Sequence, residues 1–165
     1  MKTLLMFRGA PGCGKSTFIK EHGLESYSLS ADDIRLMCQA PIQRVDGSYS
    51  ISQANNDYVW KLLFEILEQK MKRGEFVIID ATNSSSKEME NYKYLVESYK
   101  YKALIVDMTD IPIDVCKERN ANRLPEYKRV PDFVIDRMYK NFIQPIPKWI
   151  KVIKPEEVDD LITEE

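Results

Sequence analysis

The fold is decided by residues 3–17, which read TLLMFRGAPGCGKST. The mostly apolar residues 3–7 predict a buried strand, and a helix is expected from residue 16. Between them lies Gly9-x-x-x-x-Gly14-Lys15-Ser16, which is the spacing of a phosphate-binding loop. Glycines at these positions let successive backbone N–H groups face an anion, and the N-terminus of the next helix adds its positive end.

The side chains at the end of this loop have expected roles with a bound nucleotide. Lys15 is expected to reach the β and γ phosphates, and the hydroxyl of Ser16 is the expected ligand of Mg²⁺. A glycine-rich turn without a ligand leaves Lys15 and Ser16 unexplained. The sequence therefore predicts that ATP or another NTP binds here with Mg²⁺, at positions Gly12, Cys13, Gly14, Lys15, Ser16 and Thr17.

The composition is typical of one globular domain, with 165 residues, 44% hydrophobic and 30% charged. No apolar run approaches the ~20 residues of a membrane span, so no membrane partner is expected. The first apolar stretch is too short for a signal peptide. Three unpatterned cysteines indicate a reducing, cytoplasmic location without a disulfide framework, and the single His22 argues against His-rich metal sites.

The rest of the chain alternates strands and helices, which predicts an α/β fold with a parallel sheet. Strands are expected at 3–7, 27–30, 76–80, 101–108 and 149–153, and helices at 16–22, 31–39, 52–74, 84–99, 112–123 and 131–144. Residues 41–50, with Pro, Asp-Gly and Ser, predict a loop. We expect about five parallel strands joined by right-handed crossovers, with helices on both faces. The kinase domain is expected at 1–154, and 155–165 at an acidic tail or the start of a linker.

Polar side chains follow three of the expected strands at their carboxyl ends, where an open α/β sheet binds its ligand. They belong to the phosphate loop, to residues 30–35 and to the run Asp80-Ala81-Thr82-Asn83. Phosphoryl transfer needs placed charges and a base for the hydroxyl proton. Asp32 and Arg35, three residues apart on one helix, provide a base and an anion anchor. A helix cap and a solvated neighbour are equally good interpretations of this pair, and Asp33 competes for the role of base.

Two further features have both a functional and a structural interpretation. Asp80 ends a buried strand, where many P-loop proteins have an acidic residue near Mg²⁺. The structural alternative is a carboxylate that holds an arginine. Arg119 and Arg123 share one helix face, either as lid arginines over the phosphates or as a solvated basic surface. They lie in residues 117–140, where seven bases outnumber four acids, a balance compatible with a polyphosphate ligand.

Taken together, the motifs resemble those of the 5′-hydroxyl polynucleotide kinase family, the kinase domains of phage and bacterial end-healing enzymes. The matching elements are the phosphate loop, Ser30-x-Asp32-Asp33-x-Arg35, Asp80-Ala81-Thr82-Asn83, Arg119-Asn120-x-Asn122-Arg123 and Val130-Pro131, in this order. The resemblance covers roughly residues 1–145. It implies an α/β P-loop kinase fold with the strand order 2-3-1-4-5, helices on both faces of the sheet and a helical lid. It implies that Asp32 is the general base and that Arg35 holds the phosphate 3′ to the terminal nucleotide.

The same resemblance implies roles for the remaining motif residues. Lys15 and Arg123 stabilise the transferring phosphates, with Arg119 assisting from the lid. Asp80 orients Arg123 and lines the acceptor channel together with Thr82 and Asn83. Val130 lies against the terminal base.

The resemblance implies an enzyme that moves the γ-phosphate of an NTP to the 5′-OH of single-stranded or end-exposed RNA or DNA. Phosphatase and ligase modules, in the same chain or separate, are its implied partners. This chain has no Asp-x-Asp-x-Thr or Lys-x-Asp-Gly motif, so we do not expect it to heal 3′ ends or to seal. The alternatives are a kinase of a nucleoside, sugar or antibiotic, and a nucleotide-gated binding module without transfer chemistry.

Overall fold

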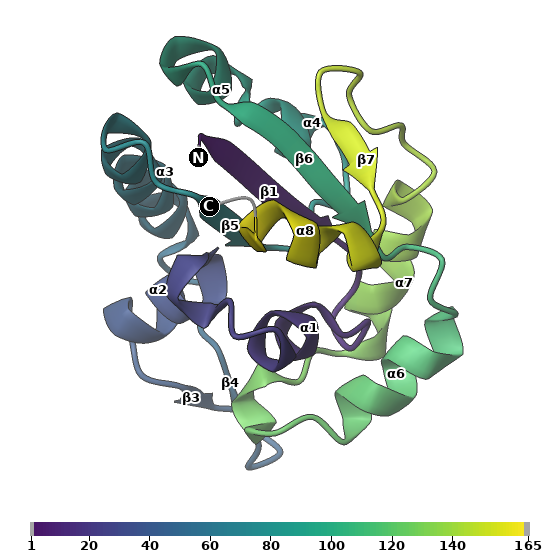
Figure 1. Ribbon diagram of the computed structural model, residues 1–165. Helices are drawn as coiled ribbons and strands as arrows, with labels where there is room; N and C mark the ends of the chain where they lie inside the picture. Colours follow the sequence, from purple (N-terminus) through teal and green to yellow (C-terminus); the bar gives the residue numbers. More distant parts are fainter. Residues whose placement is uncertain (1, 164–165) are drawn as a thin grey trace.

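A five-stranded parallel sheet forms the centre of the molecule, which we describe from a computed structural model for residues 2–163 (Figure 1). Its order is β2-β5-β1-β6-β7. The strands are β1 (Thr3–Arg8), β2 (Ser28–Ser30), β5 (Val77–Asp80), β6 (Lys102–Asp107) and β7 (Lys151–Ile153). Counting only these five strands, the order is 2-3-1-4-5, which confirms the predicted topology.

Helices cover both faces of the sheet, which explains why the three inner strands, β1, β5 and β6, are mostly apolar and buried. In β1, Leu4 and Met6 face the side covered by α3 (Asn56–Lys72) and α5 (Lys93–Tyr99). Leu5 and Phe7 face the side covered by α1 (Lys15–Glu21) and α8 (Val158–Thr163). The other helices are α2 (Ala31–Cys38), α4 (Ser86–Glu90), α6 (Ile113–Ala121) and α7 (Asp132–Asn141), with short 3-10 turns η1 (Glu25–Tyr27), η2 (Glu126–Lys128) and η3 (Pro155–Glu157). No helix within residues 2–163 is long and apolar enough to cross a membrane.

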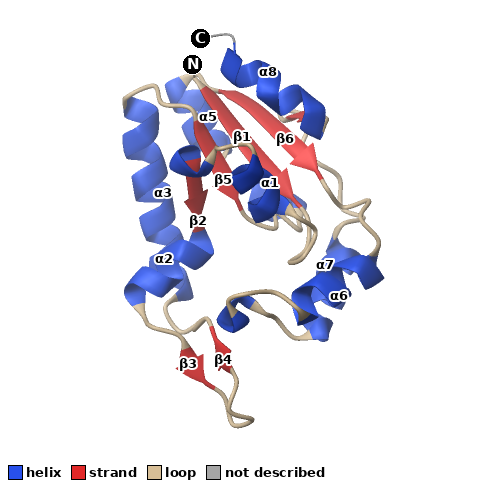
Figure 2. Ribbon diagram, turned by 60° about the horizontal axis from the view of Figure 1, so that its bottom comes forward, coloured by secondary structure: helices blue, strands red, loops and turns tan. Residues whose placement is uncertain are grey.

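The region 41–50 is more ordered than its predicted loop. Its two ends pair as an antiparallel hairpin, β3 (Ile42–Gln43) and β4 (Tyr49–Ser50), which extends beyond α2 (Figure 2). The reversal occurs at Asp46-Gly47: Gly47 has a positive φ of 87°, and the Asp46 carboxylate accepts the Ser48 backbone N–H at 2.9 Å. Turn residues therefore mark only the middle of the segment, and the prediction of a loop was wrong for its ends.

Two predicted helices also differ from the structure. The helix expected from residue 52 begins at Asn56, because the Ser52 hydroxyl accepts the Ala54 N–H at 3.2 Å in a turn that precedes the helix. The helix expected over 84–99 is divided into α4 and α5. At the division the N–H of the buried Tyr92 bonds to the carbonyl of Met89, three residues back, which is the spacing of a tighter turn.

The segment after Lys154 packs on the sheet over its described part, up to residue 163. Val158 in α8 is fully buried. Asp159 lies 2.8 Å from Nδ1 of His22, which follows α1. Glu164 and Glu165 lie outside the described residues, and the division into a kinase domain and an acidic tail or linker stays a prediction.

Candidate active site

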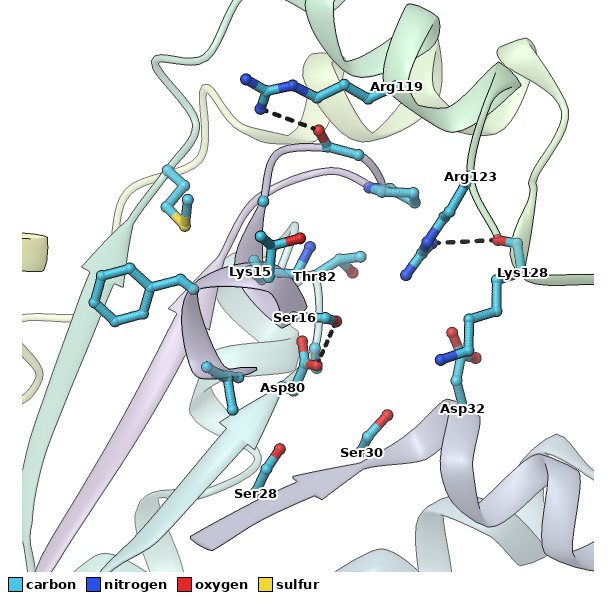
Figure 3. A pocket seen from close by; sticks show the side chains of 18 of the residues that line it. Lys15, Ser16, Ser28, Ser30, Asp32, Asp80, Thr82, Arg119, Arg123 and Lys128 are labelled. Carbon is cyan, nitrogen blue, oxygen red and sulfur yellow. Dashed lines mark hydrogen bonds between the residues drawn. The ribbon is translucent and has the colours of Figure 1, made fainter. Parts of the chain in front are cut away.

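One cavity of about 940 Å³ opens at the carboxyl ends of the strands (Figure 3). Its walls come from the phosphate loop, the start of α2, the turn after β5 and the lid segment formed by α6 and residues 122–130. The predicted site residues that line it are Gly12, Gly14, Lys15, Ser16, Thr17, Asp32, Asp80, Thr82, Arg119 and Arg123. Four other predicted residues do not line it: Cys13, Arg35, Asn83 and Val130.

The phosphate loop depends on glycine at two positions. Gly12 and Gly14 have φ values of 84° and 104°, a left-handed conformation that favours glycine. A side chain at Gly12 would also clash with the carbonyl oxygen of Cys116, because the loop packs directly on the backbone of α6. The residue between the two glycines, Cys13, is buried. Close backbone packing therefore fixes the loop beside the helix that carries Arg119.

Lys15 lies across the loop. Its ammonium donates hydrogen bonds to the carbonyl oxygens of Gly9 at 2.6 Å and Ala10 at 3.1 Å, and Cys13 Sγ is 3.6 Å away. The side chain lines the cavity although only 8% of the residue surface is exposed. A largely desolvated cation at the end of a glycine loop is what a polyphosphate requires, so the loop and Lys15 fit an NTP.

Ser16 and Asp80 provide the oxygen atoms that a magnesium ion needs beside the phosphates. The Ser16 hydroxyl donates to Asp80 Oδ2 at 2.8 Å. Among residues 2–163 no cluster of three His, Cys, Asp or Glu side chains could hold a metal alone. Mg²⁺ is ordinarily bound by one or two protein oxygens together with substrate phosphates and water. The pair therefore fits a nucleotide-bound Mg²⁺ and does not fit a dedicated protein cage.

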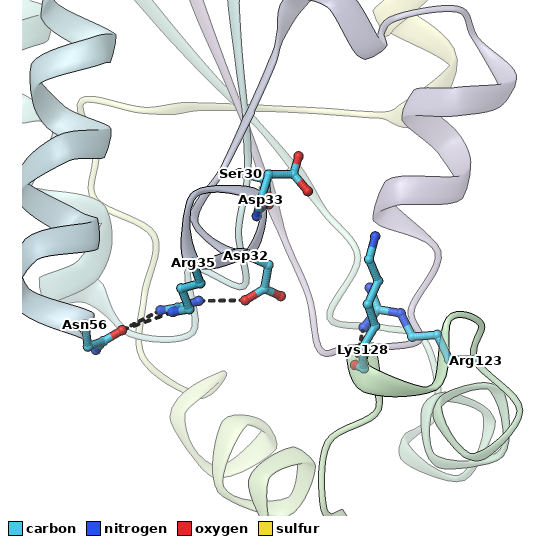
Figure 4. Close-up of polar contacts among 7 residues, drawn as sticks. All are labelled: Ser30, Asp32, Asp33, Arg35, Asn56, Arg123 and Lys128. Carbon is cyan, nitrogen blue, oxygen red and sulfur yellow. Dashed lines mark hydrogen bonds and ion pairs between the residues drawn. The ribbon is translucent and has the colours of Figure 1, made fainter. Parts of the chain in front are cut away.

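The start of α2 brings two carboxylates to the cavity. The Ser30 hydroxyl caps the helix by accepting the Asp33 backbone N–H at 3.4 Å. Asp32 Oδ1 accepts from Arg35 at 2.7 Å, and Arg35 also donates to Asn56 of α3 (Figure 4). Arg35 thus lies at the rim beside Asp32. This corner combines a carboxylate on the cavity with a guanidinium at its edge.

Asp33 lines the same cavity with a different electrostatic environment. Partial burial raises the pKa of its carboxyl group, and the charges of Asp80 and Asp32 add to this effect. The nearby ammonium of Lys128 lowers the pKa and opposes it. Lys128 is a cavity residue that the sequence analysis did not single out, although it lies in the basic segment 117–140.

The lid arginines are held by backbone carbonyls. Arg119 donates to the Cys13 carbonyl at 3.4 Å, across the back of the phosphate loop. Arg123 donates to the Lys128 carbonyl at 3.2 Å. The implied orientation of Arg123 by Asp80 is not what the structure shows: within residues 2–163 the Asp80 carboxylate bonds Ser16 instead.

Asn83 has contacts that stabilise the site from outside the cavity. The buried Asn83 has a positive φ of 45°, and its amide donates to the Phe7 carbonyl at 2.7 Å. Arg8 donates to the Asn83 carbonyl at 3.0 Å, and Gly9 N–H bonds Thr82. These contacts fasten the turn after β5 to the phosphate loop.

Val130 is held in place by its backbone. The buried amide of Asn120 donates to the Val130 carbonyl at 2.7 Å and accepts its N–H at 3.0 Å. The Val130 side chain packs on the cluster formed by Ala10, Cys13, Cys116 and Ile135. No local sequence signal marks the contacts of Arg8 or Asn56, because their partners are distant in the chain.

Comparisons with known proteins agree with this architecture. A family model described as "AAA domain" matches residues 4–145. The chain is similar to one in a structure of the Pnkp1/Rnl/Hen1 RNA repair complex, with a TM-score of 0.69 and 26% identity over 86% of this chain. It spans 44% of that chain, less than half of its length.

Two other structures share the fold over almost the whole chain. One is a putative kinase from Chloroflexus aurantiacus J-10-fl, with a TM-score of 0.67 and 18% identity over 98% of this chain and 95% of that one. The other is Chaetomium thermophilum Kti12 in complex with ADP-AlF3, with a TM-score of 0.61 and 14% identity over 98% and 97%. The fold, the phosphate loop and a family match over most of the chain agree: this protein is a P-loop kinase-like domain and belongs to the AAA domain family.

Proposed function

We propose that the protein is a polynucleotide 5′-hydroxyl kinase that transfers the γ-phosphate of an NTP to the 5′-OH end of RNA or DNA. The observation that carries the proposal is the position of Asp32. Its carboxylate lines the same cavity as Lys15 and Ser16, and it is hydrogen-bonded to Arg35 at the rim. The proposed base, Asp32, thus lies beside the proposed phosphate anchor, Arg35, which suits a hydroxyl acceptor that carries a phosphate of its own.

In the proposed reaction Asp32 accepts the proton of the 5′-OH. The 5′ oxygen forms a bond to the γ phosphorus as the bond from that phosphorus to the β–γ bridging oxygen breaks, so that NDP leaves. Lys15 and Arg123, which face the cavity from the phosphate loop and the lid, neutralise charge on the phosphates, with Arg119 assisting (Figure 3). Mg²⁺, when held by Ser16, Asp80 and the nucleotide, adds further positive charge at the phosphates.

Two observations support a nucleic-acid acceptor. Arg35 has no evident use for a small acceptor without a phosphate. The likeness to a chain of an RNA repair complex, at 26% identity, covers 86% of this chain. Phosphatase and ligase activities, supplied by other modules, are the partners we propose for a kinase of this kind.

The first test is the substitution Asp32→Ala. We expect transfer of labelled γ-phosphate to a 5′-OH oligonucleotide to fall by about 10²-fold or more, the usual contribution of a general base, while NTP affinity stays nearly unchanged. Asp33→Ala is the matched comparison, because Asp33 is the neighbouring carboxylate on the cavity. Full activity of Asp32→Ala together with an inactive Asp33→Ala would assign the base to Asp33.

The same assay separates the alternative functions. Wild-type protein is offered a 5′-OH oligonucleotide and, separately, a nucleoside. Transfer to the oligonucleotide supports the proposal, transfer only to the nucleoside indicates a small-metabolite kinase, and NTP binding without transfer indicates a binding module.

A further inference from the structure

A row of three hydrogen-bonded side chains joins two helices at the rim of the cavity. Asn56, the first residue of α3, accepts through one oxygen, Oδ1, from Nε of Arg35 at 3.2 Å and from its Nη2 at 2.6 Å. The remaining nitrogen, Nη1, donates to Asp32 Oδ1 at 2.7 Å. Figure 4 shows the guanidinium of Arg35 between Asn56 and Asp32. Its position is therefore fixed from two sides, by α3 and by its own helix.

The hydrogen-bond capacity of Arg35 is only partly used by this row. A guanidinium carries five N–H donors. The bonds to Asn56 and Asp32 occupy three of them, which leaves one N–H on each terminal nitrogen. Two N–H groups on one planar cation match two oxygens of a phosphate. The Arg35 side chain as a whole is 12% exposed, so most of it is buried.

The chemical type of residue 56 also matters. An amide oxygen occupies two donors of Arg35 without adding charge, so the Asp32–Arg35 pair and Asn56 together are neutral. A carboxylate at the same position would make the group negative and repel a phosphate. An amide at residue 56 therefore leaves the group neutral, with two N–H donors of Arg35 that neither Asn56 nor Asp32 uses.

We infer that Asn56 is a positioning residue, which holds Arg35 for the first internucleotide phosphate of the acceptor and so makes the enzyme select nucleic acid over nucleosides. This inference rests on the proposed function. It adds a determinant from α3, outside the cavity and outside the motifs of the phosphate loop, the base and the lid. Asn56 acts through Arg35 and touches no reacting atom.

The experiment compares three proteins: the wild type, Asn56→Ala and Asn55→Ala. Asn55 is the matched control, because it is the same residue type one position earlier and its side chain contacts Gln39, not Arg35. Each protein is assayed with a 5′-OH oligonucleotide whose first linkage is a phosphodiester, with the same oligonucleotide carrying a neutral methylphosphonate there, and for NTP binding.

For the phosphodiester, we expect Asn56→Ala to raise the acceptor KM by about tenfold, the size of one lost hydrogen bond to a charged group, with kcat changed less than about threefold. For the methylphosphonate, the KM of Asn56→Ala should match that of the wild type. NTP affinity and the Asn55→Ala kinetics should stay within about twofold of the wild type. A loss confined to one charged acceptor is not what a general folding defect would produce.

The outcomes separate this inference from the proposed function. An unchanged phosphodiester KM in Asn56→Ala, or an equal rise with both oligonucleotides, overturns the role of Asn56 while wild-type transfer still supports the kinase. Absence of wild-type transfer to either oligonucleotide overturns the proposed function, and this inference with it.

Discussion

Cysteine side chains differ sharply in accessibility within this protein. Cys38, the last residue of α2, is exposed, whereas Cys13 and Cys116 are buried beside the phosphate loop. Burial raises the pKa of the Cys116 thiol, although its hydrogen bond to Tyr139, at 3.2 Å, lowers it in part. A buried thiol with a raised pKa carries little of the reactive thiolate at neutral pH.

We therefore predict that one of the three thiols reacts quickly with a disulfide reagent such as DTNB in the native protein. Cys38→Ser should remove this fast reaction, and Cys116→Ser should leave it unchanged. Unfolding in urea should expose all three thiols to the reagent. Rapid modification of two thiols in folded Cys38→Ser would contradict the burial of Cys13 and Cys116.

At the scale of elements, the phosphate loop and α6 act as one packed unit. Gly12 lies against the backbone of α6, where a Cβ atom on this residue would be 3.2 Å from the Asn120 nitrogen and closer still to the Cys116 carbonyl oxygen. Asn120 in turn bonds both backbone groups of Val130. A change at the tip of the loop is therefore transmitted to the helix that carries Arg119.

The substitution Gly12→Ala tests this packing. We expect it to lower the free energy of unfolding by about 3 kcal/mol or more, since it combines an unfavourable positive φ with a backbone clash, and to weaken NTP binding. Gly47→Ala is the control, because the φ of Gly47 is also positive, at 87°, but an added methyl group meets nothing within 4 Å. We expect Gly47→Ala to lower the free energy of unfolding by about 1–2 kcal/mol. Urea unfolding measures the free energy of unfolding of both variants. An equal decrease in the two variants would contradict the packing of Gly12 on α6.

The elements that the sequence predicts well are those whose pattern is local. The strand that contains Val77, Ile78 and Ile79 is a continuous apolar run because both of its faces are buried, and that run is visible in the sequence. The glycine spacing of the phosphate loop is likewise local, and the structure places most of its residues on the cavity. The cap at Ser30 follows from its neighbours in the same way.

Features that depend on distant contacts could not be predicted. Arg35 and Asn56 are 21 positions apart, and Arg8 bonds carbonyls 75, 76 and 136 positions away. The hydrophobic pattern of the sequence does not indicate such partners, because they meet only after the sheet and its helices have packed. The same holds for Asn83, whose motif position suggested the acceptor site and whose amide instead bonds the Phe7 carbonyl.

At the scale of the whole molecule, the C-terminal segment completes the core. α8 closes the face of the sheet that α1 covers, with Val158 fully buried among the residues of that face. His22 bonds Asp159 and stacks on Phe18, with 4.0 Å between the ring centroids. Asp159 and Asp160 lie on the first turn of this helix, whose Val158 side chain faces inward.

Val158→Ala should therefore lower the free energy of unfolding by about 2 kcal/mol, from lost burial and the cavity left behind. Val45→Ala is the same substitution at the exposed tip of the β3–β4 hairpin. It should alter the free energy of unfolding by less than about 0.5 kcal/mol. Urea denaturation compares the two variants. A loss of less than about 0.5 kcal/mol in Val158→Ala would mean that α8 adds little to the fold.

The parallel sheet also fixes where the two ends of the described chain lie. β1 begins and α8 finishes side by side, at the pole of the molecule opposite the carboxyl ends of the strands (Figures 1 and 2). A tether attached to either end would leave the cavity facing away from the point of attachment. The protein can thus be immobilised or fused through either of these ends with its cavity open to solvent.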